Sequence, residues 1–146
     1  MNLFFDTSAL VKFFHEEKGT QRVTNLINSE ENKIWISEIA CLEFHSAIFR
    51  RFRNREINEK ELQTAVSGFD EQIASFYIEP LGDAIVREAE FLLKEYGKIY
   101  GLRTLDSLHV GVYNLICDED RFFVTSDSTL CDVLDQIGIK TINPLN

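Results

Sequence analysis

Residues Leu3 to Phe14 read LFFDTSALVKFF and place an acid directly after a short apolar run. The run Leu3–Phe5 is wholly apolar, which is typical of a strand buried on both faces of a sheet. From Thr7 onward the apolar residues recur at the spacing of a helix. The stretch therefore predicts a buried strand that ends at Asp6 and leads straight into a helix.

The rest of the chain repeats this alternation of short apolar runs and helical segments. Further strands are expected at Lys33–Ile36, Phe76–Ile78, Phe122–Val124 and Thr141–Ile142. Strands separated by helices favour a parallel sheet that is covered on both faces. The sequence predicts one α/β domain over residues 1–146, with a central, mostly parallel sheet of about five strands flanked by helices.

Helix boundaries can also be predicted. Asn58 with Glu61 three residues later resembles the capping box of a helix that runs to about Ile73. Expected N-caps of two further helices are Ser37 and Asp83, and Gly97 is an expected helix stop.

Helical spacing also predicts which residues face the core. On the helix after Ser37, these include Leu42 and Phe49. On a helix that opens at Arg103 or Thr104, they include Leu105 and Leu115.

The totals fit a soluble globular domain. Hydrophobic residues make up 45% and charged residues 27% of the 146 residues, and the 12 Phe predict a core rich in aromatic rings. No apolar run approaches the roughly 20 residues of a membrane span, and the start lacks the basic region of a signal peptide. Cys41, Cys117 and Cys131 form no CxxC pair, so neither a zinc site nor a disulfide framework is expected. We expect a cytoplasmic protein.

Two acids follow strands directly. Asp6 closes LFF and Asp127 follows FFVTS. In open α/β sheets, ligands bind outside the carboxyl ends of the strands, so both acids are candidates for a functional site. The structural alternative is that each is only a helix N-cap, where Asp is favoured.

Two further acids lie on predicted helices among apolar neighbours. Glu43 belongs to IACLEFHSA and Asp106 to GLRTLDSLHVGV. Acids in such places are also found paired with an Arg or with backbone donors, and Arg103 is a candidate partner for Asp106.

Taken together, the four acids indicate a metal site, because clustered like charges in a low dielectric are tolerated when a cation compensates them. Oxygen-only ligation favours Mg²⁺ or Mn²⁺. The hydroxyls of Ser8, Thr125 and Ser126 lie close to the strand-end acids in sequence and are candidates for orienting the carboxylates. These hydroxyls are equally common in turns and caps.

Four segments resemble the signature segments of PIN domains, and more narrowly those of the VapC toxins of toxin–antitoxin pairs. They are DTSALVKFF at Asp6–Phe14, SEIACLEFHSA at Ser37–Ala47, LRTLDSLHV at Leu102–Val110 and FFVTSDSTL at Phe122–Leu130. The closing GIKTINP resembles the last strand of that family. The resemblance covers nearly the whole chain in the family's order.

The resemblance implies a Mg²⁺- or Mn²⁺-dependent endoribonuclease that cuts structured RNA such as tRNA or rRNA. It implies that Asp6, Glu43, Asp106 and Asp127 are the metal-binding and catalytic acids, assisted by Ser8 and by Thr125 or Ser126. It also implies a homodimer and a cognate antitoxin that covers the acidic site. Alternatives are a non-catalytic PIN module and a housekeeping RNA-processing nuclease.

The net charge of −9 counts against a protein that tracks a long nucleic-acid backbone. Against that background, the segment FRRFRNR contains Arg50, Arg51, Arg53 and Arg55. These arginines would bind RNA phosphates or an acidic antitoxin segment, or else they form a solvated helix end.

Three residues near the predicted site have weaker claims to a role in it. His109 is expected to be a satisfied helix histidine rather than a proton shuttle. Glu38 competes with Glu43 as the helix acid but falls in the first turn, where a capping or dipole role suffices. Asp132 is expected to be exposed.

An aspartyl phosphatase is disfavoured, because that chemistry needs an Asp where this chain has Ser8.

Overall fold

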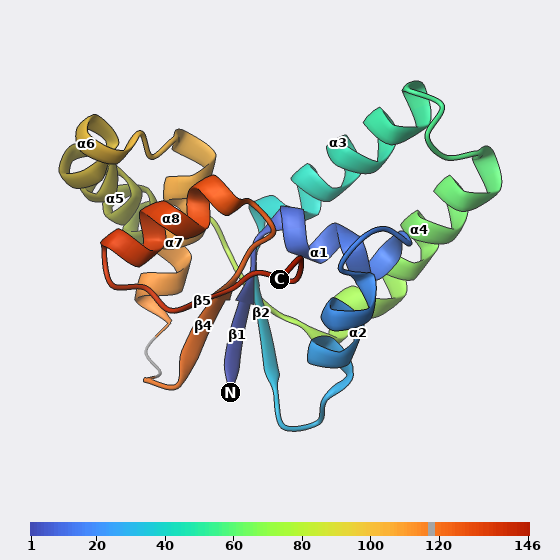
Figure 1. Cartoon of the computed structure of the whole chain (residues 1–146), viewed down its shortest axis with the longest axis horizontal. Helices are drawn as coiled ribbons and strands as arrows, with labels where there is room; N and C mark the ends of the chain where they lie inside the picture. The colour runs from blue at the N-terminus through green and yellow to red at the C-terminus, as the bar shows by residue number, and fades with distance from the viewer. Residues whose placement is uncertain (117–118) are drawn as a thin grey trace.

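The computed structural model describes residues 1–116 and 119–146 (Figure 1). Its centre is one sheet in the order β3-β2-β1-β4-β5, in which every neighbouring pair is parallel. The strands are β1 (Asn2–Phe5), β2 (Lys33–Ser37), β3 (Tyr77–Glu79), β4 (Arg121–Val124) and β5 (Thr141–Ile142). This confirms the predicted α/β architecture with five parallel strands.

The first strand lies in the middle of the sheet. Leu3 of β1 pairs with Ile34 of β2 on one side and with Phe122 of β4 on the other. Because all strands run in the same direction, their carboxyl ends meet along one edge. Figure 1 shows that α1, α3 and α8 begin at this edge.

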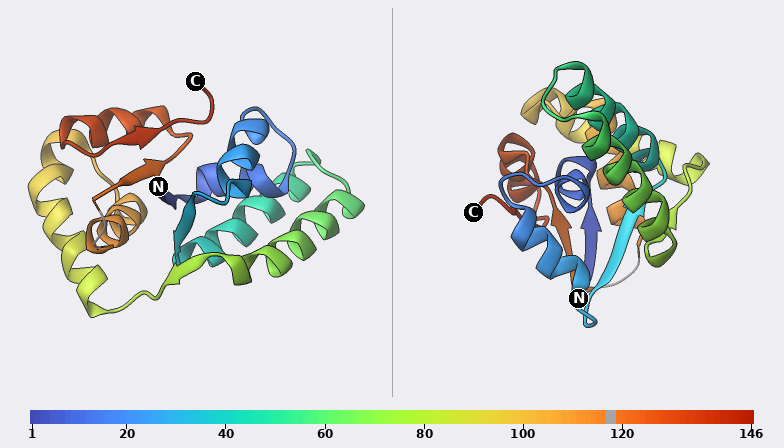
Figure 2. Two further views of the ribbon diagram at one scale, coloured as in Figure 1. Left: turned by 90° about the horizontal axis from the view of Figure 1, so that it is seen from below. Right: turned by 90° about the vertical axis from the view of Figure 1, so that its right-hand side faces the viewer.

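Helices cover both faces of the sheet (Figures 1 and 2). On one side are α1 (Thr7–Phe14), α2 (Thr20–Asn28), α3 (Ile39–Arg53) and α4 (Glu59–Gln72), with the short 3₁₀ turn Ile73–Ser75. On the other are α5 (Asp83–Leu92), the π-helical turn Leu93–Gly97, α6 (Lys98–Tyr100), α7 (Thr104–Leu115) and α8 (Ser128–Gln136).

Alternate residues of β1 supply two separate hydrophobic clusters, as expected for a strand buried on both faces. Leu3 and Phe5 pack in the cluster with α1–α4, whereas Phe4 packs in the cluster with α5, α7 and α8. Phe44 and Phe69 stack in the first cluster with ring centroids 4.3 Å apart. Six of the 12 phenylalanines are buried, so the core is rich in aromatic rings, as predicted.

The buried faces of two helices differ from the prediction. On α3 the buried stripe is Ala40, Phe44 and Ile48, while Leu42 is 74% exposed. The stripe begins with a small residue, and apolar side chains also lie outside it, so the apolar pattern alone did not identify the correct face. Three more residues predicted to be inward are exposed for the same reason: Phe49, Leu105 and Leu115.

Helix ends were predicted with mixed success. The capping box of α4 is confirmed, since Asn58 Oδ1 accepts the Glu61 N–H at 2.8 Å and Glu61 Oε1 accepts the Asn58 N–H at 3.1 Å. The N-caps of α3 and α5 are Glu38 and Gly82, rather than Ser37 and Asp83.

Gly97 was wrongly predicted as a helix stop. It keeps helical angles, and the chain ends its turn at Gly101, whose φ is 73°. The π-helical turn extends the helix past the expected glycine.

Among the described residues, Cys41 and Cys131 are free thiols, and Cys117 lies outside the described residues. None of the helices in the part of the chain that the structure describes is long and apolar enough to span a bilayer.

Candidate active site

Asp6 ends β1 and caps the helix that follows it. Its Oδ1 accepts the backbone N–H of Ala9 at 3.1 Å and the hydroxyl of Ser8 at 2.7 Å. The side chain is buried, with 6% of the residue exposed. Burial raises the pKa of Asp6 above its ordinary value, although hydrogen bonds and the nearby His109 oppose the rise. Asp6 is therefore a helix N-cap, as the structural alternative predicted. Its carboxyl group is nevertheless buried at the sheet edge, which costs stability.

Asp127 repeats the arrangement on the neighbouring strand. It follows β4 and caps α8, with Oδ1 accepting the Leu130 N–H at 3.1 Å. Hydroxyl groups connect the two strand ends. Ser8 Oγ and Thr125 Oγ1 are 3.2 Å apart, and Thr125 Oγ1 accepts the Asp127 N–H at 3.1 Å. Asp6 and Asp127 are thereby joined through two side-chain hydroxyls.

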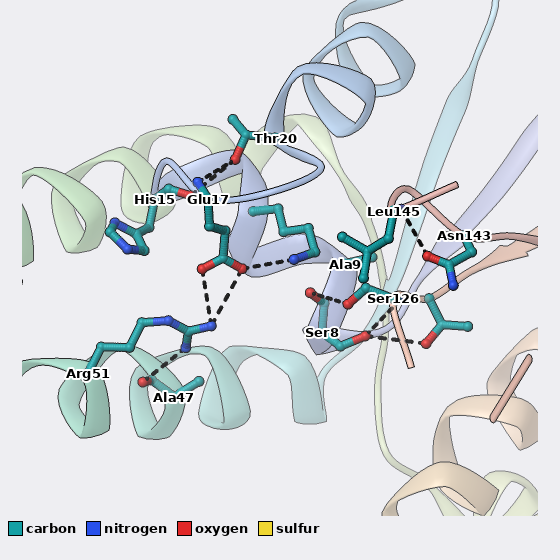
Figure 3. A network of polar contacts seen from close by, with 12 residues as sticks. Ser8, Ala9, His15, Glu17, Thr20, Ala47, Arg51, Ser126, Asn143 and Leu145 are labelled. Atoms are coloured by element: carbon teal, nitrogen blue, oxygen red, sulfur yellow. Dashed lines mark hydrogen bonds and ion pairs between the residues drawn. The ribbon is translucent and has the colours of Figure 1, made fainter. Parts of the chain in front are cut away.

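Ser126 fixes the same junction from its other side. Its N–H donates to Ser8 Oγ at 3.1 Å, and its own hydroxyl donates to the Ser8 carbonyl at 3.1 Å. Figure 3 shows Ser8 and Ser126 facing each other between the two strand ends. The hydroxyls expected to assist the acids thus tie the α1 and α8 starts together.

Glu43 points from α3 toward the start of α1 and toward α7. Its Oε1 accepts the Thr7 hydroxyl at 2.9 Å and lies 2.5 Å from Nε2 of His109. Burial alone would raise the pKa of Glu43, but the hydrogen bonds from His109 and Thr7 outweigh it, so the pKa lies below its ordinary value. Glu43 is accordingly held as an ionised carboxylate.

Asp106 lies in the first turn of α7 and pairs with Arg103, as the structural alternative predicted. Arg103 Nε donates to Asp106 Oδ2 at 3.4 Å, and the same guanidinium lies 3.8 Å from Asp127 Oδ2. Burial raises the pKa of Asp106; Arg103 opposes the rise and the nearby Asp127 adds to it. Arg103 therefore bridges two carboxylates that repel each other.

One chain of contacts thus connects three of the four acids. It runs from Asp6 through Ser8 and Thr125 to Asp127, and then through Arg103 to Asp106. Glu43 joins the same neighbourhood through its contact with His109, which lies close enough to Asp6 and Asp106 to oppose the rise in the pKa of each.

The donor set fits a hard divalent cation, because its ligands are carboxylate oxygens. Asp106 and Asp127 are close enough to repel, and Arg103 supplies part of the positive charge that balances them. Within residues 1–116 and 119–146, no group of three or more His, Cys, Asp or Glu side chains is arranged so that it could hold a metal ion. The fit is thus one of chemistry and shared location, with the acids linked through Ser8, Thr125, Arg103 and His109.

A groove of about 410 Å³ runs from this edge between α1 and α3. Glu43, Ser8 and Ser126 line one part of it, and Arg50, Arg51 and Arg53 are among the residues that line the rest. A second recess of about 300 Å³ opens beside Arg103, Asp106 and Asp127, toward Tyr100 and α8. The acids therefore lie where two surface recesses approach each other.

The arginines of the FRRFRNR segment divide into two groups. Arg51 lies 3.3 Å from Glu17, and Lys12 lies 3.1 Å from the same carboxylate, so one negative charge is shared between these two positive charges (Figure 3). None of the ion pairs between described residues involves Arg50, Arg53 or Arg55. Arg53 and Arg55 also line a separate hollow of about 590 Å³ at the α3–α4 connection.

The weaker candidates have distinct places. Glu38 Oε2 accepts the Leu81 N–H at 2.8 Å, a structural contact outside its own helix, and its side chain does not cap that helix as expected. Asp132 is exposed, as predicted. His109 is buried and contacts Glu43, a contact between α7 and α3 that sequence spacing could not indicate. The role of Thr7 was also missed, although its place next to Asp6 could have suggested one.

Comparison with known proteins identifies the family. The model of the PIN domain matches residues 3–133. FitAcB from Neisseria gonorrhoeae is similar in structure, with a TM-score of 0.69 and 16% identity over 97% of each chain. VapC20 from Mycobacterium tuberculosis, described as a sarcin-ricin loop cleaving toxin, has a TM-score of 0.70 and 13% identity over 97% of this chain and 99% of that one.

VapBC2 from Rickettsia felis, solved with a DNA fragment from its promoter, has a TM-score of 0.66 and 17% identity over 98% of each chain. No curated protein matches the chain in sequence. At these identities the structural similarity shows a shared fold. The match to the PIN domain model extends over most of the sequence. The chain belongs to the PIN domain family.

Proposed function

We propose that the protein is a Mg²⁺- or Mn²⁺-dependent endoribonuclease. The observation that carries the proposal is the chain of contacts that gathers Asp6, Asp106 and Asp127 at the carboxyl edge of the sheet, with Glu43 beside them. Several acids gathered at this edge are costly unless a cation compensates their charge, and a cation held there can in turn bind an anionic substrate. A phosphodiester and a divalent ion together meet that requirement.

The contacts of the acids and of the neighbouring hydroxyls indicate a role for each group. Asp6, Asp106, Asp127 and Glu43 would supply ligand oxygens, and a bound divalent ion would supply charge stabilisation for phosphodiester hydrolysis and a lowered pKa for an attacking water. Ser8, Thr125 and Ser126 hold the two strand-end acids in register through hydroxyl hydrogen bonds. The adjoining groove admits an RNA strand to Glu43.

We further propose that the protein is the toxin of a VapBC-type pair that acts in the cytoplasm as a homodimer. What supports this is the fold shared with several toxin–antitoxin complexes. Exposed Leu42 and Val86 offer apolar surface for pairing. A short adjacent reading frame for a small DNA-binding antitoxin, and a dimeric mass in solution, are the expected observations.

The direct test is cleavage of total cellular RNA by the purified chain with Mg²⁺ or Mn²⁺. We expect Asp6→Asn and Asp106→Asn each to lower the rate by at least about a hundredfold, since each removes an anionic ligand oxygen of the divalent ion, a larger loss than the roughly 10- to 100-fold typical of groups that only orient a ligand. Asp132→Asn, an exposed acid on α8, is the matched control and should cleave as the wild type does.

Cleavage that persists in both variants, or in EDTA, would contradict this function. A folded wild type that cuts no cellular RNA but binds it would instead support the non-catalytic PIN module. Cleavage confined to precursor RNA would favour a housekeeping nuclease.

A further inference from the structure

The contact between His109 and Glu43 joins two helices that are far apart in the sequence. His109 lies in the middle of α7 and is 3% exposed, with its ring edge-on to Phe4 at 6.0 Å between centroids. Its Nε2 lies 2.5 Å from Oε1 of Glu43. A buried histidine is thus held by core packing on one side and directed at a site acid on the other.

The two ring nitrogens of His109 have different surroundings. A carboxylate oxygen can only accept, so Nε2 carries the proton and donates to Glu43. Nδ1 is buried and has no hydrogen-bond partner among the described residues. Among the described residues, the hydrogen bond that this side chain forms therefore comes from Nε2.

Glu43 is fixed through one oxygen. Oε1 accepts from both His109 and Thr7, whereas none of the hydrogen bonds between described residues uses Oε2. Glu43 also lines the groove between α1 and α3. Two donors on one oxygen set the rotation of the carboxylate and leave the other oxygen for the groove.

We propose that His109 is a positioning residue: its Nε2–H holds Glu43 so that the free carboxylate oxygen is presented to the divalent ion. This inference rests on the nuclease function proposed above. The plain alternative is that His109 only fills space in the core between α7 and β1. The two readings differ in which nitrogen matters, because packing depends on ring volume and not on Nε2.

Two isosteric amides separate these readings. In His109→Gln, the side-chain amide nitrogen takes the place of Nε2, whereas in His109→Asn it takes the place of Nδ1. Mn²⁺ affinity is measured by titration calorimetry without RNA, and cleavage is measured in parallel. Loss of a group that orients a metal ligand typically lowers affinity or activity by about 10- to 100-fold. We expect such a loss in His109→Asn, with His109→Gln within roughly threefold of the wild type.

Equal losses in both variants, or no loss in His109→Asn, would overturn the proposal. Nitrogen NMR of the wild type provides a reading that needs no variant: a proton on Nε2 supports the proposal, and an unprotonated Nε2 overturns it. Asp6→Asn separates this proposal from the function itself. If the wild type cleaves no more than Asp6→Asn, yet His109→Asn still weakens Mn²⁺ binding, the nuclease function fails while the positioning role stands.

Discussion

At the scale of single residues, the site carries a cost that the rest of the fold must offset. Asp6 is buried at the end of β1 in surroundings that raise its pKa, so ionising this carboxyl group costs stability in the folded chain. Burial also raises the pKa of Asp106 on α7. Such costs are characteristic of functional sites, where stability is given up for chemistry.

We therefore expect Asp6→Asn to stabilise the protein in EDTA at pH 8, by on the order of 1 kcal/mol or roughly 3 °C in Tm. Asn keeps the N-cap, because its side-chain oxygen can still accept the Ala9 N–H. The folded state retains the Asp6 proton to a higher pH than the unfolded chain does, so stability falls as pH rises through the interval between the two pKa values.

Thermal melts of wild type and variant across pH check this expectation. The Tm of Asp6→Asn should exceed that of the wild type by a growing margin as pH rises above the ordinary pKa of Asp. The two Tm values should coincide in acid. Asp132→Asn serves as the exposed control. A variant less stable than the wild type at pH 8 would show that the carboxylate of Asp6 stabilises the fold.

Arg103 also acts at this scale, because one exposed guanidinium bridges Asp106 and Asp127. Its charge competes with a divalent ion for these oxygens. We expect Arg103→Gln to bind Mn²⁺ about fivefold more tightly in calorimetry, corresponding to roughly 1 kcal/mol of relieved repulsion. Arg87→Gln, an exposed arginine on α5, controls for the change in net charge. Weaker binding in Arg103→Gln alone would mean that the arginine preorganises the carboxylates.

At the scale of elements, the segment before α7 determines where Arg103 and Asp106 lie. Gly97 has helical angles, and a Cβ there would meet the Leu102 carbonyl oxygen at an ordinary 3.5 Å. Gly101 has a φ of 73°, a region that L-residues avoid. We expect Gly101→Ala to destabilise by about 1 kcal/mol and Gly97→Ala to stabilise by up to about 1 kcal/mol. Urea unfolding of the two variants measures both changes in stability. If Gly97→Ala destabilised the protein and Gly101→Ala stabilised it, Gly97 would be the helix end after all.

The elements also show how far sequence reasoning extends. Short apolar runs next to Asp6 and Asp127 predicted the strands, because period and chain direction are local properties. The capping box at Asn58 was found for the same reason. The face of α3 was not, since Ala40 and Leu42 are both apolar and only the tertiary packing selects between them. The contact of Glu43 with His109 is tertiary as well.

At the scale of the whole molecule, the net charge of −9 leaves few places where RNA phosphates are attracted. The groove beside Glu43 is one such place. Glu17 pairs with both Lys12 and Arg51 there, whereas Arg50 and Arg53 line the groove without an ion-pair partner among the described residues. In the proposed function, these two arginines would supply a short local contact with RNA rather than contacts along an extended strand.

Removing these two arginines should weaken RNA binding and its dependence on salt together. In single-stranded RNA each phosphate contact contributes about 0.7 to the slope of log affinity against log salt, so Arg50→Ala with Arg53→Ala should reduce the slope by about 1.4. Fluorescence anisotropy in the Asp6→Asn background measures binding without cleavage. Arg87→Ala removes a charge outside the groove and should leave the slope nearly unchanged. An unaltered slope in the double variant would make these arginines a solvated helix end, and RNA would then have to approach the acids from the recess beside Arg103.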